Sequence, residues 1–135
     1  MLGSEYVIVL VGVSQKQLKN LPYNIIGIRR TADQKEMAQW YATADLYVNL
    51  TYCDTYPTVN VESVACRTPV LSYMTGGSSE SMFGYGEVVP KGDIEAVYNA
   101  IVALAHCDRD KWTPVSVDKL DNTYYLGKYI ELLLK

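Results

Sequence analysis

The stretch DLYVNLTYCDTYPTVNVESVACRTPVLSYMT, residues 45–75, decides the fold, because it predicts a strand, a helix and a second strand in succession. Residues 45–51 and 69–75 are short, almost continuously apolar and rich in β-branched and aromatic side chains, as strands covered on both faces are. Residues 57–66, between them, carry apolar side chains at helical spacing, namely Val61, Val64 and Ala65. Such a unit predicts two parallel strands with the connecting helix packed on the sheet.

The same alternation extends in both directions along the chain. Further strands are predicted at 6–13, 24–30 and 86–90, and further helices at 33–44, 93–106 and Val117–Leu134. The helix at 93–106 has the clearest amphipathic stripe, which consists of Ile94, Val97, Ile101 and Leu104. The fold class predicted is therefore α/β, a doubly wound, mostly parallel sheet with helices on both faces.

Composition limits the classes of function. The 135 residues fit one domain, 1–135, with a C-terminal helix region at 113–135, and the 49% apolar and 20% charged contents are typical of a soluble globular protein. A net charge of -3 gives no electrostatic attraction for nucleic acid or for an anionic membrane, and it suits a small-molecule site. The three cysteines lack paired CxxC spacing, so neither a disulfide framework nor a structural metal is favoured.

The candidate site lies in the loop after the strand at 45–51. Ligands of parallel sheets bind beyond the carboxyl ends of the strands, and Asp54 falls there. Pro57 suits the first turn of the following helix, whose amides at Tyr56 and Thr58 would then face a phosphate. Asp54 before the helix start and Glu62 inside the helix are acceptors for the hydroxyls of a sugar and a ribose.

Each of these residues also has a simpler interpretation. Asp54 alone is more often a turn or capping residue, and Glu62 alone is more often a solvated helix residue. The pair Gly76–Gly77 alone is a tight turn after a strand. Only their spacing and the order of the flanking segments favour a binding site.

Residues 54–80, DTYPTVNVESVACRTPVLSYMTGGSSE, resemble the donor-binding segment of family 4 glycosyltransferases of the GT-B fold, and the similarity covers residues 6–106. The resemblance implies a Rossmann-like half of such an enzyme, and it assigns no catalytic residue, metal or cofactor to this chain. Carried over residue by residue, it implies donor-sugar contacts by Asp54, Thr55, Tyr56 and Glu80, ribose binding by Glu62, phosphate binding by Tyr56, Thr58, Gly76 and Gly77, and a base pocket at Gly27, Ile28 and Arg29.

Three residues depart from the family pattern. Asp54 replaces a glutamate and is one methylene shorter, and Thr55 stands where the family often has glycine, which restricts the backbone near the phosphates. Arg67 occupies the glycine position of the motif ACGTPV. If its backbone is left-handed, a residue other than glycine costs about 1 kcal/mol there.

The resemblance implies a retaining glycosyltransferase that takes a UDP- or GDP-sugar and serves polysaccharide biosynthesis. It further implies a cytoplasmic enzyme, either free or attached peripherally to the membrane. The resemblance also implies that the chain is a fragment, without the first strand of this domain and without the amino-terminal domain, which binds the acceptor in the family. We therefore expect the isolated chain to transfer no sugar and to self-associate through an uncovered sheet edge.

Two alternatives remain from the sequence. The same fold hosts nucleotide-sugar epimerases, of which this chain would be a half-domain. A non-catalytic GT-B-like interaction domain is the alternative from another class, and in it Asp54 and Glu62 could change without consequence.

Overall fold

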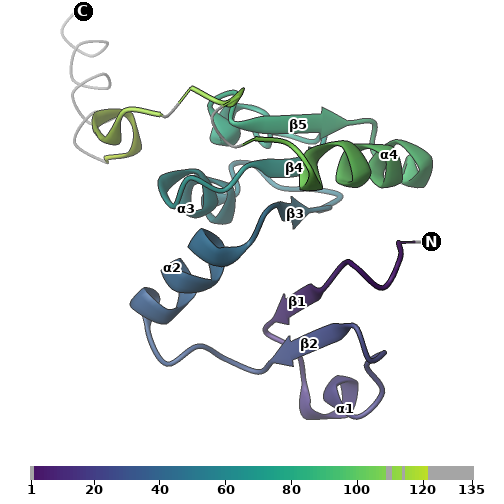
Figure 1. Cartoon of the computed structure of the whole chain (residues 1–135). Coiled ribbons are helices and arrows are strands. Elements are labelled where there is room, and N and C mark those ends of the chain that lie inside the picture. The colour runs from purple at the N-terminus through teal and green to yellow at the C-terminus, as the bar shows by residue number, and fades with distance from the viewer. Residues whose placement is uncertain (1, 109–110, 114, 122–135) are drawn as a thin grey trace, which may run out of the picture. The chain divides into compact units, whose positions relative to one another are not determined.

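The computed structural model describes residues 2–108, 111–113 and 115–121. The chain divides into two compact units, Met1–Trp40 and Tyr41–Lys135 (Figure 1). The strands pair within two sheets, one of two strands and one of three, and all pairs are parallel.

The first unit contains the two-stranded sheet. Strands β1 (Ile8–Val11) and β2 (Ile25–Ile28) are connected through a short helix, α1 (Gln15–Leu18). A capping box starts this helix: the Gln17 amide N–H donates to Ser14 Oγ at 3.3 Å, and the Ser14 amide N–H donates to Gln17 Oε1 at 2.9 Å. The sequence analysis did not predict α1, because four residues are too few to show a helical period.

The prediction that the strands at 6–13 and 24–30 are covered on both faces is wrong. None of the described residues in 2–40 is buried, and the side chains of Val7 and Ile26 are 63% and 47% exposed. The physical reason is size, since two strands and a one-turn helix have too little apolar surface to enclose one another.

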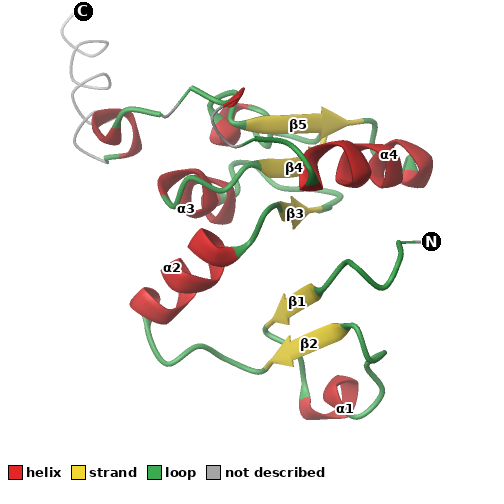
Figure 2. Ribbon diagram, viewed as in Figure 1, coloured by secondary structure: helices red, strands yellow, loops and turns green. Residues whose placement is uncertain are grey.

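The second unit contains the three-stranded sheet, ordered β3 (Tyr47–Asn49), β4 (Val70–Tyr73) and β5 (Gly86–Val89), which lie side by side in Figure 2. All four residues of the central strand β4 are buried, as predicted for a strand covered on both faces. The same prediction is wrong for β3, an edge strand of this sheet in which no residue is buried. Helix α2 (Gln34–Thr43) precedes β3 and crosses the boundary between the units.

Helices α3 (Thr58–Ala65) and α4 (Ile94–Ala105) cover opposite faces of this sheet. Side chains of β4 alternate between the two faces: Val70 lies in one apolar cluster with Val64 of α3, whereas the next residue, Leu71, lies in another with Val97 and Leu104 of α4. The predicted fold class, α/β with parallel strands between helices, is confirmed.

Some details of the helices differ from the prediction. The buried residues of α3 are Asn60, Ser63 and Val64, so the expected burial of Val61 and Ala65 is wrong. In α4, Val97 and Leu104 are buried as expected, but Ile94 is 67% exposed because it is the first residue of the helix. Two 3₁₀ helices, η1 (Glu80–Met82) and η3 (Val117–Leu120), complete the described elements, and the rest of the helix expected at Val117–Leu134 lies outside the described residues.

Helix α3 ends in a Schellman motif with an arginine in place of glycine. The Arg67 amide donates to the Val64 carbonyl at 2.9 Å, and the Thr68 amide donates to the Ser63 carbonyl at 3.0 Å. Arg67 itself has a φ of 60°, in the left-handed region. The predicted departure at this position is therefore confirmed, and it leaves backbone strain at the turn that leads into β4.

Replacing Arg67 with glycine should raise the free energy of unfolding by about 1 kcal/mol, because glycine adopts the left-handed backbone without a Cβ penalty. Urea denaturation of the chain measures the change. Arg67→Ala is the control, since it removes the exposed side chain but keeps the Cβ. Equal stability of the glycine and alanine variants would contradict the assignment of strain to this residue.

Candidate functional site

Two loops contact each other at the carboxyl end of the three-stranded sheet. The Gly77 amide, in the loop after β4, donates to the Thr55 carbonyl, in the loop after β3, at 3.0 Å. A Cβ atom on Gly76 would lie 1.9 Å from the Asp54 carbonyl oxygen, and one on Gly77 would lie 2.2 Å from that of Thr55. Only glycine permits this approach, which brings Gly76 beside Asp54 in the loops that follow the carboxyl ends of β4 and β3.

Helix α3 begins shortly after Thr55, and one of the backbone amides next to its start already has a hydrogen-bond partner. The Tyr56 amide donates to Asp54 Oδ1 at 3.1 Å, so Asp54 forms a turn of its own as well as flanking the helix. Pro57 is the N-cap, with φ -69° and ψ 108°, rather than the first helical residue as expected, and it supplies no side-chain cap. The Thr58 amide has no acceptor within the helix, which is the arrangement that binds anions.

The backbone of Thr55 carries no left-handed strain, although the family often has glycine there. Among the described residues other than glycine, only Arg67 and Phe83 have positive φ values in the left-handed region. The freedom needed for the close approach comes instead from Gly76, whose φ is +46°.

Glu62 lies in the middle of α3, beside two tyrosines that the sequence analysis did not identify. The Tyr41 hydroxyl, from α2, donates to Glu62 Oε2 at 3.3 Å, and its ring contacts that of Tyr47 edge to face at a centroid distance of 5.2 Å. Burial raises the pKa of the Tyr41 phenol, and Tyr47 and the Glu62 carboxylate raise it further. A phenol is protonated at neutral pH in any case, and the raised pKa extends the donor state of Tyr41 to more alkaline solution.

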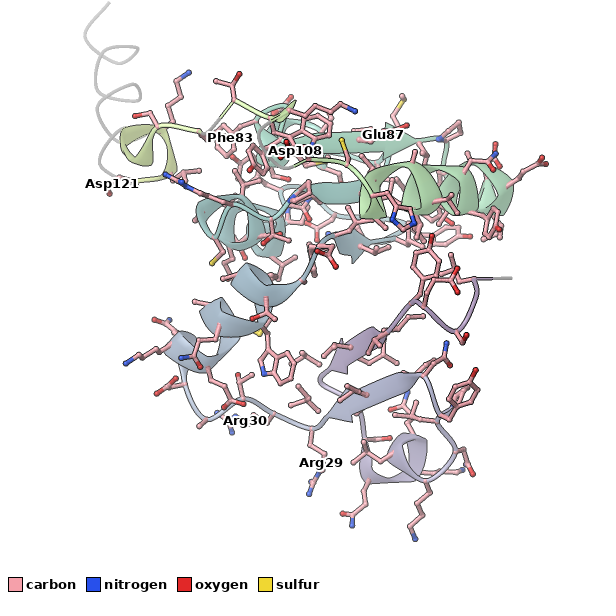
Figure 3. All side chains as sticks on the ribbon, in the orientation of Figure 1. Arg29, Arg30, Phe83, Glu87, Asp108 and Asp121 are labelled. Atoms are coloured by element: carbon pink, nitrogen blue, oxygen red, sulfur yellow. The ribbon has the colours of Figure 1, made fainter. Side chains whose placement is uncertain are left out.

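The other predicted residues are placed on separate elements. Glu80 is the exposed first residue of η1, which follows directly on the Gly76–Gly77 loop. Gly27, Ile28 and Arg29 belong to the first unit, at the end of β2, where the Arg29 side chain projects away from the ribbon (Figure 3).

A buried polar network next to the two loops was not predicted from the sequence. Asn60 of α3 is fully buried, and its side-chain amide contacts Asn49, Ser78 and Ser81. The available signal was a polar residue among the apolar positions of the first turn of α3. Periodicity analysis counts apolar residues only and does not find such a network.

Metal-type clusters and membrane-spanning helices are both absent from the described part of the chain. No three His, Cys, Asp or Glu side chains gather there as they would around a metal ion. None of the described helices is long and apolar enough to cross a bilayer.

Comparison with known proteins connects this geometry to a family. The Glycosyl transferases group 1 family matches residues 3–107. A D-inositol 3-phosphate glycosyltransferase of Thermobispora bispora is 37% identical over 105 residues, which cover 77% of this chain and 24% of that protein. A D-inositol 3-phosphate glycosyltransferase 2 of Catenulispora acidiphila is 33% identical over 54 residues, which cover 40% of this chain and 13% of that protein.

The matched segments thus span at most 24% of the length of these two relatives. The family match, in contrast, takes in most of this chain and includes both loops of the candidate site. The resemblance seen in residues 54–80 is confirmed at the level of the family, and the chain belongs to the Glycosyl transferases group 1 family.

Proposed function

We propose that this chain is the donor-binding part of a longer glycosyltransferase that transfers a sugar from a nucleoside-diphosphate sugar. The observation that carries the proposal is the contact between the Asp54–Thr55 loop and the Gly76–Gly77 loop in front of the uncapped start of α3. A helix start and a glycine loop together supply backbone amides for a diphosphate, here those of Thr58 and Gly76. The Tyr56 and Gly77 amides already donate within the two loops, so they would have to exchange partners to bind a phosphate.

The carboxylates divide the rest of the donor between them. Asp54 Oδ1 accepts from the Tyr56 amide, which fixes the orientation of the carboxylate. Its second oxygen, together with Glu80, accepts from the sugar hydroxyls. Glu62 binds the ribose hydroxyls, and the Tyr41 hydroxyl fixes its rotamer. For the base, the family resemblance alone suggests Gly27, Ile28 and Arg29.

The finer details of the proposal follow the family resemblance. The donor is a UDP- or GDP-sugar, and transfer proceeds with retention of the anomeric configuration. A growing polysaccharide is the proposed acceptor. The two relatives described above are named for D-inositol 3-phosphate, which makes a phosphorylated cyclitol the second acceptor class to test.

The test compares Glu62→Ala and Asp54→Ala in the full-length protein by calorimetry with UDP, GDP and their sugar conjugates. Glu62→Ala should weaken both the nucleoside diphosphate and the sugar nucleotide by at least about tenfold, because charge-assisted bonds to ribose are lost. Asp54→Ala should weaken the sugar nucleotide but leave the diphosphate nearly unaffected, because its partner is the sugar.

Glu87→Ala is the matched control, since Glu87 is an exposed carboxylate on β5 and belongs to neither loop (Figure 3). It should bind both ligands as the wild type does. Equal losses for both ligands in both site variants, with the fold intact, would mean that the carboxylates do not divide the donor in this way.

A further inference from the structure

We propose that Asn60 is a positioning residue whose buried amide fixes the loop after β4 against the loop after β3, so that the donor diphosphate meets a preformed site. The expected effect of Asn60 on donor binding rests on the proposed function. The expected effect of Asn60 on the position of the loops does not depend on any ligand.

The side chain of Asn60 joins three elements of the second unit. Its Oδ1 accepts from Asn49 Nδ2, at the end of β3, at 2.9 Å. Its Nδ2 donates to Ser81 Oγ, in η1, at 3.0 Å and to the Ser78 carbonyl at 3.4 Å. Asn49 and Asn60 bracket the loop that carries Asp54, so a single amide fixes both ends of that loop and contacts the glycine loop as well.

The loop after β4 is held at further points around Ser78. Ser81 Oγ donates to the Ser78 carbonyl at 2.8 Å. Thr75 Oγ1 donates to the Thr51 carbonyl, in the loop after β3, at 3.2 Å and lies 3.2 Å from Ser78 Oγ. These bonds surround Gly76 and Gly77 on both sides in the sequence, although neither glycine has a side chain that could fix its own position.

An amide is an unfavourable choice at this position unless its bonds are needed. Asparagine is a poor helix former, and burying its polar atoms destabilises the fold unless each finds a partner. Among the described residues, every buried side-chain nitrogen and oxygen atom has a hydrogen-bond partner. A satisfied buried network specifies one arrangement of the groups that it joins, and a preformed site loses less entropy when a ligand binds.

The test uses Asn60→Ala and Ser81→Ala, with Ser63→Ala as the matched control. Ser63 and Ser81 are both fully buried, and each donates to one carbonyl, but Ser63 Oγ bonds to the Thr68 carbonyl at 2.9 Å, away from the loops. Hydrogen exchange of the Gly77 amide, thermal unfolding, and calorimetric affinity for UDP and GDP are measured in the full-length protein.

Gly77 amide exchange should accelerate by about tenfold or more in Asn60→Ala and Ser81→Ala, and the affinity for the nucleotide that binds the wild type should fall by about fivefold or more. Ser63→Ala should change neither, although its unfolding temperature falls. Ser81→Thr, which keeps the hydroxyl, should restore exchange and affinity toward the wild-type values.

Equal exchange and affinity in Asn60→Ala and Ser63→Ala would overturn the proposal, because Asn60 would then act on stability alone. If neither nucleotide binds the wild type, the proposed function fails, and the exchange data alone decide the positioning role. Faster Gly77 exchange confined to the Asn60 and Ser81 variants would then support it, and exchange like that of the control would overturn it.

Discussion

Replacing Gly76 with alanine should lower the affinity for nucleotide by more than about tenfold and lower the free energy of unfolding by about 2–4 kcal/mol. Two effects combine at this position. The left-handed φ of +46° costs a residue with a Cβ about 1 kcal/mol, and the new Cβ would lie 1.9 Å from the Asp54 carbonyl oxygen. The Asp54 loop must therefore move away from the glycine loop, and the diphosphate site opens.

Gly84→Ala separates the two effects. Gly84 also has a left-handed φ, +76°, but a Cβ there would meet no atom within 4 Å. This variant should lose only the stability due to backbone strain and should bind nucleotide like the wild type in calorimetry. Similar losses of affinity in both variants would show that the contact between the loops is not what binding requires.

Leu71→Ala should lower the free energy of unfolding by about 2–5 kcal/mol, because it leaves a cavity in the central strand. Leu71 has no exposed surface and packs against Tyr73 and the buried face of α4. Urea denaturation measures the loss. Val102→Ala, at a 36% exposed position of α4, should change stability by about 0.5 kcal/mol or less. Comparable effects of the two substitutions would contradict the position of the core.

The sequence predicted the second unit better than the first. β4 is apolar except for Ser72 and is buried throughout, because helices cover both of its faces. β1, Ile8–Val11, is wholly apolar but lacks such cover, and none of its residues is buried. Composition indicates that a strand is suited to burial, whereas burial itself depends on what packs against it.

The candidate site was predicted where parallel topology determines it. The loops after β3 and β4 follow neighbouring parallel strands, whose carboxyl ends meet at one edge, so the approach of Asp54 to Gly76 could be foreseen. The bond from Tyr41 to Glu62 could not, because it joins residues that are 21 positions apart and have no characteristic spacing. The same limit applies to Asn60, whose partners come from two other elements and a loop.

Donor binding by these loops is the central claim, and a titration of the isotope-labelled full-length protein with UDP and GDP, followed by amide chemical shifts, tests it most directly. The account predicts saturable shifts of the Thr58, Gly76 and Gly77 amides with one of the two nucleotides, while the Gly84 amide, in the turn before β5, stays unchanged. The account would be contradicted if the chemical shifts of these three amides stayed constant while those of other amides changed. It would also be contradicted if neither nucleotide changed any chemical shift.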